Sequence, residues 1–159
     1  MRRATDADWA RIWPIWHAIV AAGETYTWDP GTGETEARQV WMLPGPAEVW
    51  VAEQDGVIEG TALLKPNQPG LGAHIANAGF MVAAGAAGKG VGRALAERIV
   101  DRARELGYRG MQFNAVVGTN TRAIRLWKSL GFEIVGTIPE AFRHARLGYV
   151  DLHIMYRRL

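Results

Sequence analysis

Residues 85–93 have the sequence GAAGKGVGR and directly precede a helical pattern, and this stretch decides how the rest of the chain is interpreted. Helix N-termini favour acidic side chains because their unpaired backbone amides make that end partially positive. This stretch instead contains Lys89 and Arg93, and glycines between them leave the amides open. An anion bound there would satisfy the amides and would pair with both cations. The stretch therefore indicates an anion-binding turn.

Three other interpretations of the glycine turn are compared with this one. A Walker phosphate loop requires Ser or Thr after its lysine, whereas Lys89 is followed by Gly90 and Val91. A dinucleotide fold places its glycines after the first strand of a parallel sheet, and here they follow the strand at 74–82 of a largely antiparallel one. A tight turn without any ligand is the third alternative. The glycines alone do not separate that alternative from an anion site.

The regions around the turn predict a mixed α/β sheet with helices on both faces. Strands are expected at 1–4, on both sides of Asp55-Gly56, and at 74–82, 111–117, 132–142 and 149–159; helices are expected from Thr5 or Asp6 to about Ala22 with a kink or restart at Pro14, and at 34–43, 91–106 and 120–130. The strand at 74–82, the helix after it and the strand at 111–117 form a βαβ unit. Those two strands should therefore be parallel, and the rest of the sheet antiparallel.

Composition indicates a single soluble domain over residues 1–159. Hydrophobic residues make up 48% of the chain and the net charge is +2, with no long run of one sign, which argues against bulk nucleic-acid binding. The N-terminal apolar stretch is too short and too polar to span a membrane or to act as an export signal, so a cytoplasmic protein is expected. The absence of cysteine excludes disulfides, zinc-thiolate sites and thiol catalysis, and no metal site is indicated.

A second motif gives the glycine turn its context. The segment NTRAIRLWKSLGF runs from Asn120 to Phe132, and together with VAAGAAGKGVGRAL it resembles the two signature segments of the GNAT superfamily of N-acyltransferases. The matching positions are Val82, Gly90, Gly92, Asn120, Ala123, Leu126, Gly131 and Phe132. The resemblance implies a mostly antiparallel sheet in which the strands at 74–82 and 111–117 splay apart at the centre.

The resemblance also implies acetyl-CoA as the acyl donor and direct attack by an amine in a ternary complex. It places the pyrophosphate on the turn, the pantetheine arm along the backbone of the strand at 74–82, and the arm's amide against Asn120. The residues expected to bind the cofactor are Met81, Val82, Gly88, Lys89, Gly90, Val91, Gly92, Arg93, Asn120 and Trp127. Backbone N–H groups at Met81 or Val82 are the expected donors to the developing oxyanion.

Two positions depart from the family pattern. Ala87 stands where the family usually has Arg or Gln, and Trp127 stands where many members have the Tyr that protonates the departing thiolate. An indole N–H cannot titrate, so Trp127 is no general acid. An alkyl thiol has a pKa of about 8.5, so its thiolate can leave unaided near neutral pH. Alternatively, Tyr149 or Tyr26 reaches the sulfur from another element.

Two asparagines inside apolar strands indicate where the acceptor binds. Asn77 and Asn114 are poor strand residues, and a buried amide needs partners. They are expected either to orient the substrate in catalysis or to bond neighbouring backbone. With Asn120 they resemble the asparagine triplet of fungal acetyltransferases that act on proline analogues, and the C-terminal segment resembles phosphinothricin-type enzymes. The resemblance favours a small amino or imino acid as the acceptor.

The remaining site predictions concern the acceptor pocket and its base. Tyr26 and Trp28 are expected to wall the pocket, and His144, between two arginines, is expected either to contact an anionic substrate or to be exposed. The candidate bases are Glu24 and Asp29, while His153 in a strand is expected to be structural. The alternatives are a protein or peptide N-acetyltransferase and a non-catalytic acyl-CoA-binding module. A homodimer through the C-terminal strands is also expected.

Overall fold

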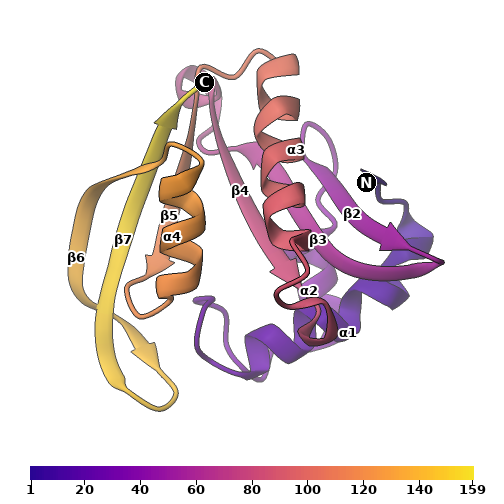
Figure 1. Ribbon diagram of the computed structural model, residues 1–159, viewed down its shortest axis with the longest axis horizontal. Coiled ribbons are helices and arrows are strands. Elements are labelled where there is room, and N and C mark those ends of the chain that lie inside the picture. Colours follow the sequence, from indigo (N-terminus) through magenta and orange to yellow (C-terminus); the bar gives the residue numbers. More distant parts are fainter.

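The computed structural model covers residues 1–159 and contains one seven-stranded sheet in the order β1-β2-β3-β4-β5-β7-β6 (Figure 1). The strands are β1 (Arg2–Arg3), β2 (Glu48–Gln54), β3 (Val57–Pro66), β4 (Ile75–Val82), β5 (Gly110–Val117), β6 (Glu133–His144) and β7 (Gly148–Arg158). The helices are α1 (Trp9–Ala21), α2 (Glu34–Trp41), α3 (Val91–Glu105) and α4 (Thr121–Ser129), with single turns η1 (Asp6–Asp8), η2 (Gly70–Gly72) and η3 (Ala84–Ala86). Only β4 and β5 pair in parallel. The predicted mixed sheet is confirmed.

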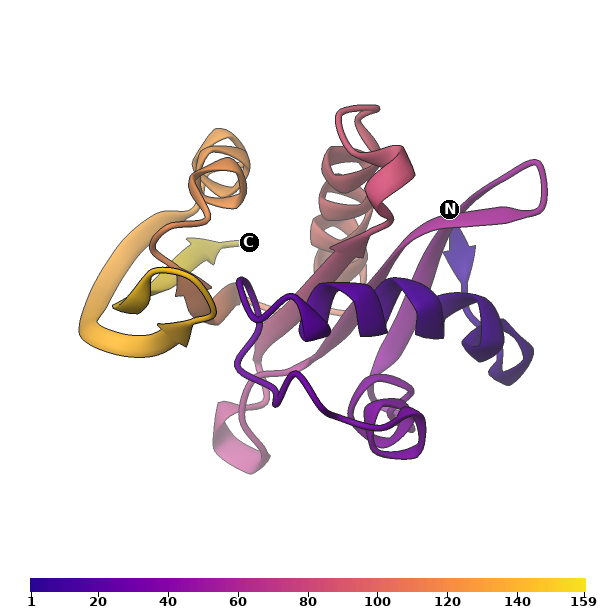
Figure 2. The same cartoon turned by 90° about the horizontal axis from the view of Figure 1, so that it is seen from below.

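The helices cover both faces of the sheet, as Figure 2 shows, with α1 and α2 on one side and α3 and α4 on the other. Side chains alternate along each strand, so Leu63 packs in the core beneath α1 and α2 while Leu64 packs in the core beneath α3. Helix α3 has 15 residues, and none of the helices combines the length and the apolar character needed to cross a bilayer.

Local sequence explains most of the element boundaries. Asp55 and Gly56 both have positive φ angles, 50° and 79°, as a two-residue hairpin turn requires, and β2 and β3 pair on either side of them. The predicted restart of the first helix at Pro14 is wrong, because α1 continues through Pro14. The η1 turn precedes Trp9 instead, and the Asp8 carboxylate caps the start of that turn by accepting the backbone N–H of Thr5 at 2.7 Å.

The splay between β4 and β5 decides where a ligand can reach the sheet. Their register pairs are confined to Ile75 with Gly110 and Ala76 with Met111, and beyond these the strands diverge (Figure 1). β5 then follows β7, with an irregularity in their pairing between Phe113 and Val116. The facing backbone edges of β4 and β5 are therefore open along most of their length.

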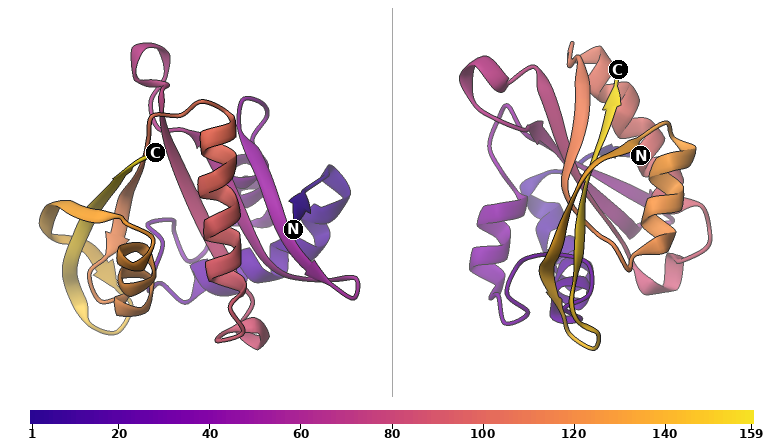
Figure 3. Two further views of the ribbon diagram at one scale, coloured as in Figure 1. Left: turned by 45° about the horizontal axis from the view of Figure 1, so that its top comes forward. Right: turned by 90° about the vertical axis from the view of Figure 1, so that its left-hand side faces the viewer.

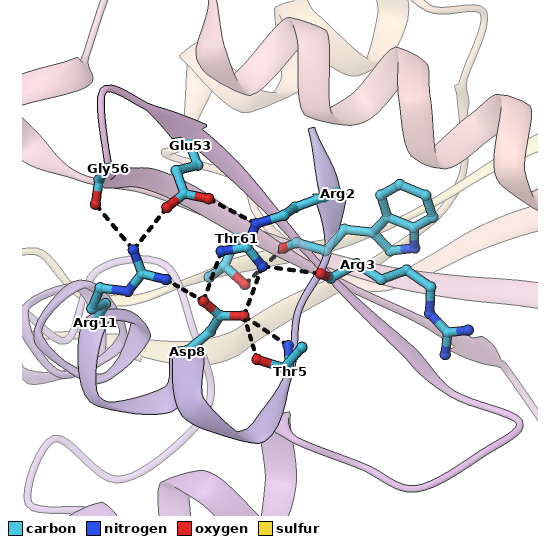
Figure 4. Close-up of polar contacts among 9 residues, drawn as sticks. Arg2, Arg3, Thr5, Asp8, Arg11, Glu53, Gly56 and Thr61 are labelled. Carbon is cyan, nitrogen blue, oxygen red and sulfur yellow. Dashed lines mark hydrogen bonds and ion pairs between the residues drawn. The ribbon is translucent and has the colours of Figure 1, made fainter.

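The N-terminus is fixed by a cluster of charged side chains around Asp8 (Figure 4). The Arg2 guanidinium forms two hydrogen bonds of 2.8 Å to the Asp8 carboxylate, and it donates to Glu53 at 2.7 Å. Arg11 bonds both Asp8 and Glu53, so β1, η1, α1 and β2 meet in one network. Hydrogen bonds, those from Arg2 foremost, hold the pKa of Asp8 far below its ordinary value although burial opposes the shift.

Candidate active site

A cavity of about 1040 Å³ passes between the diverging strands β4 and β5. At one end it is lined by the turn before α3 and by α4, and at the other by the loop at 25–28, by α2 and by the ends of β3 and β5. The cavity therefore connects the two faces of the sheet. We call these the α3 end and the α1 end.

The turn before α3 is open to an anion. Gly88 and Gly90 have φ angles of 86° and 84°, and a Cβ added at either would meet no atom within 4 Å. No side chain caps α3, and the backbone amides at 88 and 90–93 donate to no protein acceptor. Unpaired amides at a helix N-terminus are a ready site for phosphate. The predicted residues Gly88, Gly90, Val91, Gly92 and Arg93 all line the cavity.

The cations near this turn differ in where they lie. Arg93 lines the cavity and donates to the Ser129 hydroxyl at 2.9 Å, which links α3 to α4. Arg122, which the sequence analysis did not single out, also lines it. Lys89 does not: its side chain is 62% exposed and its Nζ lies 3.8 Å from the carboxylate of Glu59. The prediction that Lys89 contacts the cofactor has no support in this geometry.

The backbone of β4 faces the cavity at alternate residues. At one end of the pairing with β3, the Ala83 N–H donates to the Glu59 carbonyl at 2.8 Å. At the other end, the Ile75 carbonyl accepts the Asn67 N–H at 2.7 Å. Hydrogen bonding alternates along antiparallel strands, so Phe80 and Val82 direct their backbone groups away from β3. Met81 directs its backbone toward β3, and its side chain is fully buried in the core. The predicted contact at Met81 therefore has no support in this geometry, because only its neighbours direct backbone groups toward the cavity.

Tyr26 already bonds this open edge. Its hydroxyl accepts from the Phe80 N–H at 2.9 Å and donates to the Phe80 carbonyl at 2.9 Å. Burial raises the pKa of Tyr26, so the hydroxyl stays neutral and acts as a hydrogen-bonding group. A Cβ at Gly79 would lie only 3.2 Å from Trp41 and 3.3 Å from this hydroxyl, which is why the strand has no side chain there.

The α4 wall of the cavity is aromatic and carries no acid. Trp127 is buried, lines the cavity and packs with ring centroids 4.7 Å from Phe113 and 5.0 Å from Phe80. Asn120 caps α4 by accepting the Ala123 N–H at 3.2 Å, which leaves its amide N–H groups for the cavity that it lines. Tyr149 is 66% exposed on the β6–β7 hairpin and lines no part of this cavity. Its predicted catalytic role is therefore withdrawn.

The two strand asparagines lie together at the α1 end. Asn77 donates to the Gln112 carbonyl of β5 at 2.9 Å and so bridges the two diverging strands. Asn114 accepts from the Gln112 side chain at 2.9 Å and donates to Asn67 at 2.7 Å. Both line the cavity, and each keeps further donor and acceptor capacity. The backbone bond of Asn77 also bears out part of the structural interpretation.

Aromatic rings wall the same end. Tyr26 and Trp28 stack with centroids 5.0 Å apart, and the edge of each approaches Trp41 at 6.4 and 6.1 Å. The predicted wall residues thus line the cavity, and Trp41 joins them from α2. These rings bound the space beside the asparagines.

None of the predicted bases reaches this cavity. Glu24 pairs with Arg146 at 2.6 Å, and the Asp29 carboxylate accepts the Gly31 N–H at 2.7 Å. His153 bonds Thr137 at 2.8 Å. The charged residues that line the cavity are Lys65, Arg93 and Arg122, and no acid or histidine is among them.

His144 lies in a second cavity of about 640 Å³, between the loop at 23–30 and the β6–β7 hairpin. Figure 3 shows this hairpin reaching down beside the loop, where Ala145 donates to the Gly23 carbonyl at 3.0 Å. The His144 side chain is buried, and its Nδ1 accepts the Arg146 N–H at 3.1 Å. The residues at 26–28 line both cavities and separate them. The structure therefore does not bring His144 to the asparagines.

Sequence analysis missed Lys65, Phe80 and Arg122 among the residues that line the cavity. Lys65 carried a signal, because it is the one charged residue in the apolar run TALLK. Phe80 stood in the strand predicted at 74–82 and Arg122 in the second motif, but nothing in the sequence indicated which backbone groups or which side chains face the cavity.

Comparison with known proteins places this geometry in a family. The model of the acetyltransferase (GNAT) family matches residues 11–132. The N-acetyltransferase aca1 of Schizosaccharomyces pombe is 42% identical over 96 residues, which are 60% of this chain and 46% of aca1. This chain thus spans less than half the length of aca1. The L-methionine sulfoximine/L-methionine sulfone acetyltransferase of Salmonella typhimurium is 31% identical over 147 residues, 88% of this chain and 83% of that enzyme.

Solved structures agree with the family match. A GCN5-related N-acetyltransferase from Kribbella flavida is 52% identical and superposes with a TM-score of 0.95 over 99% of this chain and 96% of its own. The protein yncA from Salmonella typhimurium, solved with its cofactor acetyl-CoA, is 29% identical with a TM-score of 0.83 over 99% of this chain and 92% of its own. The chain therefore belongs to the acetyltransferase (GNAT) family of N-acetyltransferases, whose acyl donor is acetyl-CoA.

Proposed function

We propose that this chain transfers the acetyl group of acetyl-CoA to the amine of a small amino or imino acid. The observation that carries the proposal is the cavity through the β4–β5 splay. It joins unpaired helix amides at the α3 end to side-chain amides and aromatic walls at the α1 end. Donor and acceptor would therefore meet between the strands, each approaching from its own face.

The α3 end has the groups that a pyrophosphate and a peptide-like arm require. The amides at 88 and 90–93 would hold the pyrophosphate, with Arg93 and Arg122 supplying positive charge. The open backbone groups of Val82 would bond the arm as a neighbouring strand does, and the Asn120 amide would bond it from α4. Bound there, acetyl-CoA supplies an activated acyl group.

The α1 end favours a small acceptor. Asn77 and Asn114 would orient its polar groups, and the rings of Tyr26, Trp28 and Trp41 bound the space around them. These walls argue against a protein tail, which would need an open groove. The Salmonella relative is named for two small amino-acid analogues, which supports the same class of acceptor.

The attacking amine must be neutral, and this cavity offers it no carboxylate or imidazole as a base. Proton loss to water is therefore the route that the lining supports. With Trp127 in the position of the usual acid and Tyr149 outside, the thiolate would leave without a side-chain proton donor.

The test is a thiol-release assay with acetyl-CoA against a panel of amino acids, imino acids, amine antibiotics and peptides. Activity confined to the first two classes is expected. Asn114→Ala should then lower kcat at least tenfold while the Kd of acetyl-CoA stays within about twofold, because Asn114 lies at the acceptor end. Asn67→Ala is the matched control, because Asn67 bonds Asn114 without lining the cavity, and its effect should be smaller. Turnover of peptides alone would favour the protein N-acetyltransferase instead.

The homodimer stays a prediction. β6 is an edge strand of the sheet, and Val135 and Ile138 on it are 58% and 48% exposed. A second copy would cover these apolar side chains. Sedimentation equilibrium at micromolar concentration would test this, and a monomer would contradict it.

A further inference from the structure

Lys65 has no role in the acetyl-transfer mechanism set out above, yet it is the only charged side chain at the α1 end of the cavity. We propose that Lys65 binds the carboxylate of the acceptor and thereby selects free amino and imino acids over other amines. This inference rests on the proposed function, because it names the group that distinguishes its acceptor class.

Position and register place Lys65 beside the asparagines. It lies in β3 directly opposite Asn77 in β4, and paired residues of neighbouring strands project to the same face. That face also carries Leu63, which belongs to the core beneath α1 and α2. The loop after Lys65 supplies Asn67, which accepts from Asn114. Lys65 therefore lines the α1 end of the cavity together with Asn77 and Asn114.

The charge of Lys65 is not needed elsewhere in the protein. Its side chain is half-buried and forms no ion pair or hydrogen bond, whereas Lys89 has Glu59 within 3.8 Å. No acid lines the cavity, so nothing there would compete with an incoming carboxylate. A half-buried lysine in a lining without acids is complementary to an anion that carries its own acceptor oxygens.

Lys65 also stands apart from the cations at the α3 end. Gly60 of β3 marks that end, since a Cβ there would lie 3.2 Å from Val91 of α3. Lys65 follows five residues later, which is about 17 Å along an extended strand. A cation at that distance is too far from the helix amides to serve the pyrophosphate that they would hold. The anion that it serves is therefore a different one.

Amino and imino acids carry a carboxylate next to the amine, whereas amine antibiotics and lysine side chains in proteins do not. Pairing the carboxylate with Lys65 would fix one end of the acceptor and leave its amine directed by Asn77 and Asn114. Removing a hydrogen bond to a charged group weakens binding about tenfold to 100-fold.

The experiment measures kcat and KM for matched acceptors that differ only in the carboxylate: L-proline with L-prolinamide, and L-methionine sulfone with its carboxamide. The enzymes are the wild type, Lys65→Met, Lys65→Arg and the control Lys128→Met, which removes an exposed lysine of α4 that lines neither cavity. Comparing enzymes within each acceptor cancels the different basicities of the amines. Thermal unfolding of each variant checks that Lys65→Met is folded.

Lys65→Met should raise KM for the free acids about tenfold to 100-fold and change KM for the carboxamides by less than threefold. Lys65→Arg should keep most of the preference for acids, and Lys128→Met should match the wild type. An equal loss on acids and carboxamides, or a wild type that prefers carboxamides, would overturn the inference while acetyl transfer stands. A wild type that acetylates no acceptor of the panel would overturn the proposed function, and this inference with it.

Discussion

At the scale of single residues, Tyr26 shows how a side chain can complete a strand edge. Its hydroxyl bonds both backbone groups of Phe80, which would otherwise face the cavity unpaired. The same hydrogen bonds attach the loop at 25–28 to β4, and within this loop Trp28 stacks on Tyr26. The Tyr26 hydroxyl therefore positions the loop on β4. Because its pKa is raised, it stays protonated and keeps both hydrogen bonds over the pH range in which the enzyme works.

Tyr26→Phe should lower the free energy of unfolding by about 1 kcal/mol, because two backbone groups lose their partner. The shape of the kcat/KM profile between pH 6 and 10 should not change, because the Tyr26 hydroxyl does not titrate there. Chemical denaturation and pH-rate measurements check the two parts. Tyr108→Phe is the control, because burial also raises the pKa of Tyr108 but it lies outside the cavity. A profile altered by Tyr26→Phe alone would assign this hydroxyl to proton transfer.

At the scale of elements, the glycine turn combines two requirements in one residue. Gly90 must adopt a positive φ of 84° and must leave the amides of α3 approachable. Gly107, after the C-terminus of α3, shares the first requirement with a φ of 82° but not the second. Comparing substitutions at Gly90 and Gly107 therefore distinguishes the effect of backbone strain from the effect on ligand binding.

Gly90→Ala and Gly107→Ala should each lower the free energy of unfolding by about 1 kcal/mol, because both force a Cβ into the left-handed region. Only Gly90→Ala should weaken acetyl-CoA binding, by tenfold or more, because its methyl group projects where the pyrophosphate would lie. Denaturation curves and isothermal titration calorimetry measure the two effects. Equal acetyl-CoA affinity in the two variants would move the pyrophosphate away from this turn.

The sequence predicted where helices and strands lie better than it predicted which way the backbone groups of a strand point. Asp55-Gly56 specifies a hairpin locally, and Asn120 specifies a helix start, so both were predicted. Whether the backbone groups of Met81 or those of its neighbours face the cavity depends on which residues of β4 hydrogen-bond to β3. That is set by the register between the two strands and not by the local sequence. The position of Tyr149 depends on how far a long hairpin extends, and no local pattern encodes that.

At the scale of the whole molecule, the Asp8 network ties the N-terminus to the sheet and makes stability depend on pH. The folded-state pKa of Asp8 is lowered, so its contribution is present above the unfolded value of about 3.9 and is lost as the pH falls below it. Asp8→Asn should cost about 2 kcal/mol at pH 7, less than a fully buried pair because both arginines are partly exposed.

Urea denaturation at pH 7 and pH 3 checks this. The difference between wild type and Asp8→Asn should be large at pH 7 and should shrink at pH 3. Asp6→Asn is the control, because Asp6 is 88% exposed and pairs only with Arg38. A cost that is the same at both pH values would mean that Asp8 acts through packing and not through its charge.

The cavity collects its lining from both faces of the sheet without an acid or a histidine, and this predicts the pH dependence of turnover. kcat/KM should rise with pH until the acceptor amine is deprotonated, and the midpoint should move with the amine pKa from one acceptor to another. Rate measurements with two acceptors of different basicity test this. A midpoint near pH 6.5 for both would point to a histidine that reaches the cavity in solution.

Residues 26–28 line the first cavity on one side and the second cavity on the other. Replacing Trp28 by a small side chain would join the α1 end of the first cavity to the second cavity, which holds the buried imidazole and two arginines of the hairpin. Acceptors with a long acidic tail could then thread through. A single position in this loop would thus set how large a molecule the enzyme admits, without any change to the donor side.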